Sequence, residues 1–552
     1  IQDAMKFPDL VHALKPEQDN EIPQAASAHD TFWDFISLMP ESTHMIMWAM
    51  SDRTIPRSFR MMEGFGVHTF RLVNDKGKST FVKFHWKPLL GVHSVAWDEA
   101  QKISGKDPDF HRRDLWEAIE AGHYPQWQLG VQLVAEEDEH SFGFDLLDPT
   151  KIIPEEIVPV QIVGTLTLNR NPDNFFAETE QVAFHPGHIV PGIDFTNDPL
   201  LQGRLFSYTD TQLSRLGSPN FHEIPINRSV NTIYNNHREA HMRMQIDKGK
   251  AAYTPNSIGG GCPYMAKMSE GGFTSHHERV DGHKVRNRSS SFFDHFSQAV
   301  MFYQSQSEAE KQHIKDAFSF ELSKCKIPAI RERMVNNLTN VDMDLAKYIA
   351  YKLGLSAPEK AMPVYNGSVP ADGNQEDYAS VYAEPPVAQS DALSTANTVK
   401  DTIQSRCIAV IITDGVDGSA FTKLKKAITE ADGKVKVIAP ILGDVVADNG
   451  TRIPIDETLF NTASVLHDAV YILGGAGQAE ALLSEPDALH FVNEQYRHCK
   501  PVGFHKDAGV FLDATYIKPD EGVITNGNIE AFINAVAMHR FWDREMARKV
   551  PA

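Results

Sequence analysis

Apolar and polar side chains alternate along four stretches of the first third of the chain. A repeat of two residues puts the apolar side chains on one face of an extended backbone, which predicts half-buried β-strands. Asn74–Lys78 lies between the first two stretches and is rich in Asn, Asp and Gly, so we expect a hairpin loop there. With a helical insert near Arg112–Ala121, the pattern predicts an antiparallel barrel rather than strand–helix–strand units. The predicted strands are Val67–Val73, Thr80–Trp86, Trp127–Val134 and Gln161–Leu168.

The middle of the chain changes from irregular to helical. Residues 191–290 hold few periodic segments and much Pro, Gly, Asn and His, which indicates an arm wrapped over other domains or over a partner subunit. Apolar residues in residues 291–355 have the spacing that is typical of helices. Ser307 and Glu310 have the spacing of a capping box ahead of an amphipathic run to Leu322, and a second helical run covers Ile330–Leu355.

The last two hundred residues begin with a change of composition. Pro, Ala, Ser, Gly and Asp dominate residues 356–405, which predicts a linker. Buried-strand runs then alternate with helices over residues 406–552, which predicts a parallel, doubly wound sheet. The fold class is therefore α+β with an added α/β domain, divided at 1–190, 191–290, 291–355, 356–405 and 406–552. The predicted strands of the last part are Cys407–Thr413, Val435–Ile438, Ala469–Leu473 and Pro501–Phe504, and its helices include Ser419–Ala431 and Asn528–Lys549.

Composition narrows the class of protein. A chain of 552 residues is too long for one core, and 42% hydrophobic with 23% charged residues is typical of globular domains. The net charge of −20 repels phosphate backbones, so nucleic acid and anionic membranes are poor candidate partners. No apolar run is long enough to span a membrane. The four cysteines are far apart, which favours reduced thiols in a cytoplasmic protein over a zinc site or a disulfide framework.

One pair of residues carries candidate redox chemistry. Arg204 and Tyr208 are four positions apart, so they share one face of a helix. A guanidinium that hydrogen-bonds to a phenol oxygen favours the phenolate, because a fixed positive charge stabilises an anionic neighbour. A phenolate is a hard ligand that suits ferric iron, and tyrosine is one of the few side chains that ligate haem. By itself the spacing is also typical of core tyrosines and of surface pairs.

The segment Arg204–Tyr208 resembles the proximal haem-ligand motif of the monofunctional haem catalases. Further segments match that family in the same order, so the resemblance covers essentially the whole chain. The added α/β domain resembles the flavodoxin-like domain of the large-subunit catalases. The other matching segments are Ile1–Pro8, His29–Trp33, Asn169–Glu178 and Pro225–Arg228.

The resemblance implies a homotetrameric enzyme that disproportionates hydrogen peroxide to water and oxygen at a ferric haem and protects against oxidative stress. Tyr208 is then the axial iron ligand and Arg204 its charge partner. Arg215 is expected to reach a haem propionate or to add positive potential, with Gln212 one turn beyond Tyr208. Core packing is the alternative for the apolar residues. The remaining expected pocket residues are Phe7 on the haem face, His68 near the proximal side, and Phe184 and Leu200 as apolar walls.

The resemblance also raises a covalent modification. In some large-subunit catalases the histidine at the position of His185 is joined to the proximal tyrosine, here Tyr208. An unmodified buried histidine is the alternative. Haem b and an oxidised haem d are both open.

The family's distal histidine and asparagine lie upstream of the segment at which this chain begins, so neither role is transferred to a residue of this chain. We expect the chain to be the larger part of a longer polypeptide whose N-terminal segment carries those residues. The alternative is a haem-binding remnant that does not turn over peroxide, because the distal groups are absent from this chain.

A third function class concerns residues 406–552. The flavodoxin-like fold resembles that of the class I glutamine amidotransferases, whose nucleophilic cysteine sits at a strand-to-helix elbow. Here the strand that ends at Phe504 leads into His505, and Cys499 lies before the strand. We therefore expect a structural role for this domain rather than hydrolysis.

Overall fold

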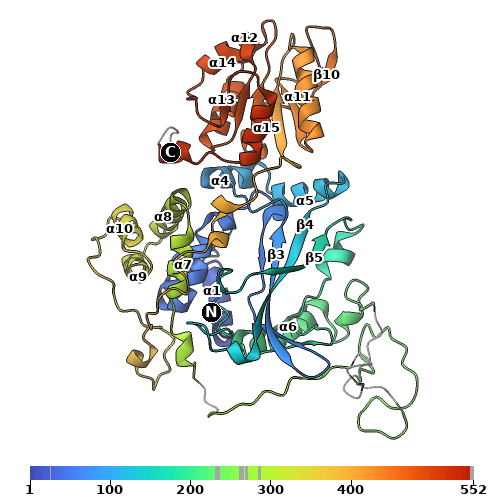
Figure 1. Ribbon diagram of the computed structural model, residues 1–552, viewed down its shortest axis with the longest axis vertical. Coiled ribbons are helices and arrows are strands. Elements are labelled where there is room, and N and C mark those ends of the chain that lie inside the picture. The colour runs from blue at the N-terminus through green and yellow to red at the C-terminus, as the bar shows by residue number, and fades with distance from the viewer. Residues whose placement is uncertain (25–26, 231–235, 260–265, 268–271, 284–286, 548–552) are drawn as a thin grey trace.

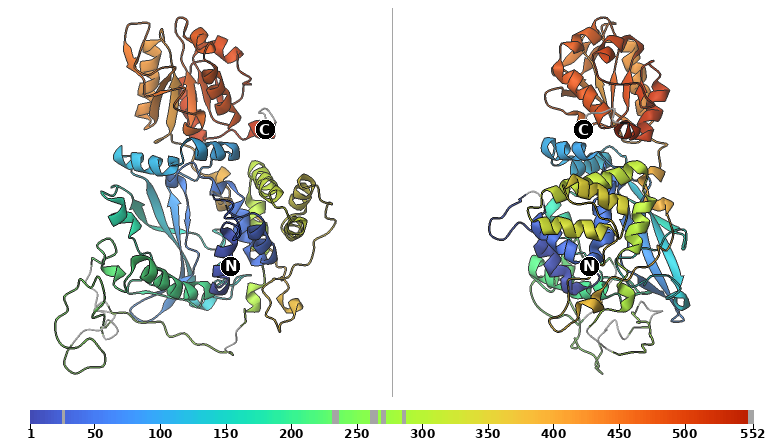
Figure 2. Two further views of the ribbon diagram at one scale, coloured as in Figure 1. Left: turned by 180° about the vertical axis from the view of Figure 1, so that it is seen from behind. Right: turned by 90° about the vertical axis from the view of Figure 1, so that its left-hand side faces the viewer.

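The computed structural model describes residues 1–24, 27–230, 236–259, 266–267, 272–283 and 287–547. Helices and sheets are both present, so the fold is a mixed α and β one. Figure 1 shows the C-terminal domain stacked on the end of the core at which helices α4 (Trp97–Lys106) and α5 (Phe110–Glu120) lie. The helices of residues 297–352 stand to one side of the antiparallel core sheet (Figures 1 and 2).

The core sheet is antiparallel and its strands follow the order β5-β4-β3-β2-β6, with β1 paired to β3. Three predicted strands are confirmed, with Phe81 of the second opposite Val134 of the third. The first begins at Phe70, later than predicted, because Thr69 bonds through its side chain and carbonyl to Leu146 and Thr196 instead of to a strand. The strands are β1 (Gly64–Phe65), β2 (Phe70–Val73), β3 (Ser79–Pro88), β4 (Gln126–Ala135), β5 (Gln161–Thr167) and β6 (Ile193–Asp194).

The hairpin between β2 and β3 is confirmed. Asn74 accepts hydrogen bonds from the backbone of Lys76 and Lys78, and Gly77 takes a positive φ of 76° that a side chain would strain. The predicted insert matches α5, whereas α4 before it was not predicted. The other helices of this part are α1 (Phe7–Leu14), α2 (Asp30–Leu38) and α3 (Thr43–Ala49).

The helical region packs around one apolar core that includes Phe302, Phe318 and Leu338. The predicted capping box is confirmed: Ser307 accepts from the backbone of Glu310, whose carboxylate accepts from the backbone of Ser307. The single helix predicted for 330–355 is wrong, because the chain turns after α9 and Asp342 caps a new helix. The helices are α7 (Ser297–Ser305), α8 (Glu308–Ser323), α9 (Pro328–Leu338) and α10 (Met343–Lys352).

Residues 356–405 contain short 3₁₀ turns and neither an α-helix nor a β-strand. The segment is nevertheless packed, because Val364 and Leu393 are buried in the core of the helical region. It therefore runs along the surface of that region as an attached connection rather than as a free tether.

The C-terminal domain has a parallel sheet of strand order β11-β8-β7-β12-β13-β14, as the alternation predicted. Separate apolar cores lie on its two faces. The helix predicted for 528–549 is wrong, because the chain leaves the helical conformation at His539 (φ 69°) and a short helix follows; residues 548 and 549 lie outside the described residues. The strands of the sheet are β7 (Cys407–Ile411), β8 (Lys434–Ala439), β11 (Glu457–Thr458), β12 (Ala469–Ile472), β13 (Val502–Phe504) and β14 (Val523–Ile524).

Helices cover both faces of this sheet, and a small hairpin lies beside it. Asp417 caps α11 by accepting a hydrogen bond from the backbone of Ala420 at 2.8 Å. The helices are α11 (Gly418–Glu430), α12 (Gln478–Leu483), α13 (Pro486–Arg497), α14 (Gly509–Asp513), α15 (Ile529–Met538) and α16 (Asp543–Met546), and the hairpin is β9 (Asp444–Val446) with β10 (Arg452–Pro454).

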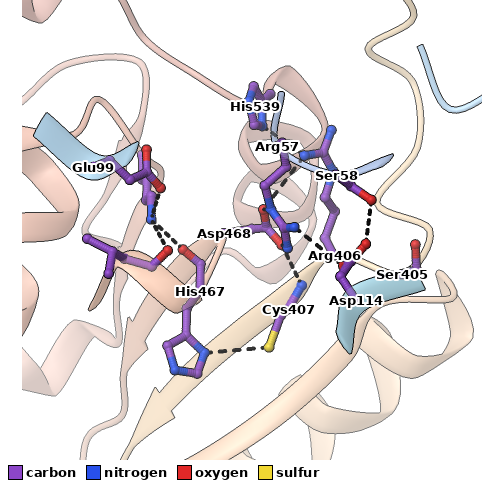
Figure 3. Close-up of polar contacts among 12 residues, drawn as sticks. Arg57, Ser58, Glu99, Asp114, Ser405, Arg406, Cys407, His467, Asp468 and His539 are labelled. Carbon is purple, nitrogen blue, oxygen red and sulfur yellow. Dashed lines mark hydrogen bonds and ion pairs between the residues drawn. The ribbon is translucent and has the colours of Figure 1, made fainter. Parts of the chain in front are cut away.

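Buried ion pairs join the core to the C-terminal domain (Figure 3). Arg57 of the core donates from Nε and Nη2 to Asp468, at 2.5 and 2.8 Å, and the backbone of Cys407 donates to the same carboxylate at 2.7 Å. Burial alone would raise the pKa of Asp468, but the charge of Arg57 holds it well below its usual range. Asp468 is therefore ionised at neutral pH and ties the two parts together.

A second buried cluster lies beside the first. Glu99 of α4 is within 2.6 Å of Lys500 and 2.9 Å of Arg540, both from the C-terminal domain. Burial works to raise the pKa of Glu99, but these two cations lower it to about 2. The junction is thus held by carboxylates that stay charged across the physiological pH range.

Candidate functional site

Helix α6 (Pro199–Leu216) carries the Arg204–Tyr208 pair on one face. Asp198 caps it by accepting hydrogen bonds from the backbone of Leu200 and Leu201 at 2.9 and 3.0 Å. Pro199 occupies the first turn, where its missing N–H costs nothing, and a glycine at positive φ ends the helix. The local sequence therefore fixes both ends of the helix on which the candidate ligand stands.

The predicted pair is formed. Arg204 Nη2 lies 2.6 Å from Tyr208 Oη, and the guanidinium carbon lies 4.7 Å from the centre of the phenol ring. Both side chains are half-buried. The guanidinium therefore donates a charge-assisted hydrogen bond to the oxygen that is the candidate metal ligand.

His68 is joined to the start of the same helix. Its Nδ1 lies 2.6 Å from Asp198, the residue that caps α6. Both residues are buried, and His68 Nε2 is a buried atom with no hydrogen-bond partner within the described part of the chain. A buried polar atom without a partner is costly, so its presence marks a place where a further group would be stabilised. Sequence reasoning missed Asp198, although Asp-Pro ahead of a helical run is a recognisable cap signal.

His185 lies beside Tyr208. The ring centres are 6.1 Å apart in an edge-to-face arrangement, and His185 Nε2 is 2.8 Å from the hydroxyl of Thr209. The ring of His188 stacks on His185 at 4.8 Å. Burial and then the neighbouring His188 lower the pKa of His185, so it is neutral at neutral pH. The structure thus brings the two residues of the expected linkage together as neighbours.

Arg215 and Gln212 hold the loop before His185 to the helix. Arg215 donates to the carbonyl oxygens of Glu180 and Val182, both at 2.6 Å, and to Gln212 at 2.7 Å. Gln212 in turn donates to the carbonyl of Phe184 at 3.0 Å. The guanidinium of Arg215 is therefore engaged with backbone here, and its expected role toward a propionate stays a prediction.

The apolar residues predicted for the pocket differ in exposure. Phe184 is 79% exposed and Phe7 is 48% exposed, while Leu200 is half-buried. Gly203 of α6 lies against Ala4, where an added methyl group would overlap it. The glycine thus lets the segment that carries Phe7 approach the helix next to Arg204.

The C-terminal domain does not present an amidotransferase elbow at the predicted position. Cys499 is fully buried, and burial raises the pKa of its thiol, which makes it a poor nucleophile. His505 follows β13, with its Nδ1 3.4 Å from Asp507. These observations give no support to hydrolysis.

His276, His277 and Glu278 are side chains of the kinds that bind metal ions. His276 pairs with Glu136 at 2.7 Å, and Glu278 pairs with the buried Arg71 at 2.8 Å. The two side chains bind this segment to residues of the core rather than meeting at one ion.

In the part of the chain that the structure describes, every helix is too short or too polar to cross a membrane.

Comparison with known proteins accounts for most of the chain. Residues 1–260 match the family model "Catalase", residues 289–353 match "Catalase-related immune-responsive", and residues 404–546 match "C-terminal domain found in long catalases". The chain is 54% identical to catalase HPII of Pseudomonas putida over 100% of its own length and 76% of that protein. It is 53% identical to a catalase of Alkalihalophilus pseudofirmus and 52% identical to catalase-2 of Bacillus subtilis, in each case over 99% of this chain and 77% of the relative.

The chain therefore belongs to the catalase family. Its match over residues 404–546 adds that it carries the C-terminal domain of the long catalases. As a catalase it is an enzyme that decomposes hydrogen peroxide, which confirms the function predicted from the sequence.

Proposed function

We propose that this chain decomposes hydrogen peroxide at a ferric haem whose iron is ligated by the phenolate of Tyr208. The observation that carries the proposal is the 2.6 Å contact between Arg204 Nη2 and Tyr208 Oη on one face of α6. When bound, the haem supplies the redox chemistry of peroxide decomposition. The residues of this chain would hold and orient it, with Arg204 hydrogen-bonded to the ligating oxygen of Tyr208.

The surroundings of Tyr208 fit such a group. Haem is a flat, largely apolar group with two carboxylates, so its site needs apolar faces and hydrogen-bond donors. Phe7 and Phe184 are exposed apolar rings on segments that contact α6 or the loop held to it. The unpartnered buried Nε2 of His68 is a polar atom at the base of the same helix. Phe7 and Phe184 would supply apolar contacts, and Nε2 of His68 a polar one.

We further infer that the core sheet is the larger part of a barrel and that the C-terminal domain is flavodoxin-like. We also infer that His185 can be joined covalently to Tyr208. The 6.1 Å ring separation supports the linkage. Peptide mass spectrometry tests it: a joined pair of peptides supports the linkage, and two separate peptides contradict it. The choice between haem b and haem d, the homotetramer, the cytoplasmic location and the divisions at 190, 290, 355 and 405 remain predictions. The distal histidine and asparagine are assigned to no residue of this chain.

The alternative is haem binding without peroxide turnover. Oxygen evolution from peroxide by the haem-loaded chain supports the enzyme, and a haem spectrum without oxygen evolution supports the alternative. The substitution Tyr208→Phe removes the ligating oxygen, so we expect it to abolish the ferric tyrosinate spectrum and peroxide decomposition. Tyr351→Phe changes an exposed tyrosine on α10 and is expected to alter neither. An unchanged ferric spectrum in Tyr208→Phe contradicts the ligand assignment.

A further inference from the structure

His313 of α8 lies between two carboxylates that come from different parts of the molecule. Its Nδ1 is 2.9 and 2.8 Å from the two oxygens of Asp52, in the core. Its Nε2 is 2.7 Å from Glu545 of α16, in the C-terminal domain. The ring of Trp542 packs edge-on against the imidazole at 4.8 Å. The imidazole is therefore a bridge across the domain junction.

The bridge needs two protons. A neutral imidazole has one N–H, so it can donate to one carboxylate only, and its other nitrogen then turns a lone pair toward the second. An imidazolium has an N–H on both nitrogens and a positive charge between two negative ones. Each nitrogen lies within 2.9 Å of a carboxylate oxygen, and an imidazolium satisfies this geometry because it donates from both nitrogens.

The other charged or titratable groups around the bridge come from four elements. His313 lines a cavity of about 960 Å³ at the junction, together with charged groups of its own helix and of three facing segments. Asp98 pairs with His498 at 2.9 Å and with Arg497 at 3.4 Å, so those charges are balanced among themselves. The charged or titratable groups of the cavity besides the bridge are Asp98 of α4, Asp316 and Glu321 of α8, Tyr348 and Lys352 of α10, and Arg497 and His498 at the end of α13.

We infer that His313 is a proton-dependent latch that fastens α16 of the C-terminal domain to the catalase core and loosens when it loses its proton. Deprotonation removes one of the two hydrogen bonds and leaves Asp52 and Glu545 facing each other across a neutral ring. Arg540, three residues before α16, keeps its hold on Glu99. Deprotonation of His313 therefore loosens this edge of the junction and the wall of the cavity, while the domain stays attached.

The electrostatics set the direction of the pH dependence. Burial alone would lower the pKa of His313, but the charge of Asp52, the hydrogen bond to it and the contact with Glu545 raise it well above its ordinary value. Because the folded pKa lies above the unfolded one, the stabilising effect is complete below the ordinary histidine pKa of about 6.5. It is lost as the pH rises through the raised folded value.

Hydrogen exchange of the haem-loaded full chain tests the latch. Amide exchange of residues 543–547, corrected for the intrinsic effect of pH, is compared by mass spectrometry between pH about 6 and pH about 9. We expect exchange at the higher pH to be faster by about tenfold or more, the factor that corresponds to one pKa unit. His313→Gln cannot be charged, so its exchange is expected to be fast at both pH values.

Two further variants make the result specific. Glu545→Gln removes the second carboxylate but keeps a group that can hydrogen-bond to Nε2, so the pH step is expected to shrink or vanish. His490→Gln changes a histidine of α13 that is mostly exposed, and its pH step is expected to match the parent. A parent chain whose residues 543–547 exchange at the same corrected rate at both pH values overturns the inference. A pH step that persists unchanged in His313→Gln overturns it as well.

Discussion

Helix α6, which carries Tyr208, and the junction between the core and the C-terminal domain differ in how their polar groups are paired. At the junction, Asp468 is held by Arg57 and by the backbone of Cys407, and Glu99 is held by two cations. At the helix, Tyr208 has one strong partner, and Nε2 of His68 has none within the described residues. Nε of Arg540, at the junction, also lacks a partner within the described residues, so the difference lies in the carboxylates, each of which has several partners. Carboxylates with several partners fix geometry, whereas a polar atom without a partner remains available to a ligand. We assign the architecture to the junction and the chemistry to α6.

The largest effect on stability is expected at the junction. Asp468→Ala leaves the buried Arg57 with only its longer contact to Asp114, at 3.4 Å, and breaking a buried pair costs roughly 3–5 kcal/mol. Urea unfolding followed by circular dichroism measures the loss. The double substitution Arg57→Met with Asp468→Leu removes both charges of the pair and is expected to recover part of the loss, because the charges of Asp114 and Arg406 remain. A loss of stability no greater than that of an exposed pair would remove the contrast between the two regions.

The next effect concerns activity rather than stability. Arg204→Leu removes the cation that hydrogen-bonds to the oxygen of Tyr208 while keeping an apolar side chain on the helix. Loss of a group that tunes a metal ligand lowers activity or metal affinity by about 10–100-fold. Initial rates of peroxide decomposition, normalised to haem content, measure it. Arg204→Lys keeps the charge and is expected to lose less; equal losses in the two variants would show that charge is not the reason.

A smaller effect tests the cap of the same helix. Asp198→Ala removes the acceptor for the backbone of Leu200 and Leu201 and also the partner of His68. The lost cap costs about 0.5–2 kcal/mol. Asp198→Asn retains a capping oxygen but loses the charge that faces His68, so it is expected to be more stable than the alanine variant. Thermal unfolding of the two variants measures the difference, and identical melting temperatures would contradict the capping role.

The smallest effect is expected at an exposed pair across the same junction. Lys434 of the C-terminal domain lies 2.9 Å from Glu117 of α5, and both side chains are about half exposed. Solvent screens such a pair, so Glu117→Gln is expected to cost at most about 1 kcal/mol. This variant is the matched control for Asp468→Ala in urea unfolding. A cost as large as that of the buried variant would show that burial does not set the strength of the junction.

Local signals predicted most of the elements. The alternation of residues 80–86 and 127–134, the capping box at Ser307 and the succession of strands and helices in residues 406–552 depend on neighbouring residues. The errors fall where apolar spacing continues across a break in the helix. The helix predicted for 330–355 is interrupted where Asp342 caps a new helix, and apolar spacing alone does not reveal this local cap.

The candidate site was only partly predictable. The Arg204–Tyr208 contact follows from helical spacing, because residues four apart meet on one face. The pairing of His68 with Asp198 joins residues 130 positions apart, and the bridge from His313 to Glu545 joins residues 232 positions apart. No local pattern encodes such contacts, since they depend on how the chain returns to the core. They became visible only in three dimensions.

Resonance Raman spectroscopy of the ferric haem-loaded chain shows whether Tyr208 ligates the iron. Excitation into the phenolate-to-iron charge-transfer band selects vibrations of a ligating tyrosinate. We predict phenolate bands that shift when the protein carries ring-deuterated tyrosine and that disappear in Tyr208→Phe. Absence of these bands from the parent chain, or their survival in Tyr208→Phe, would contradict the assignment of Tyr208 as the iron ligand.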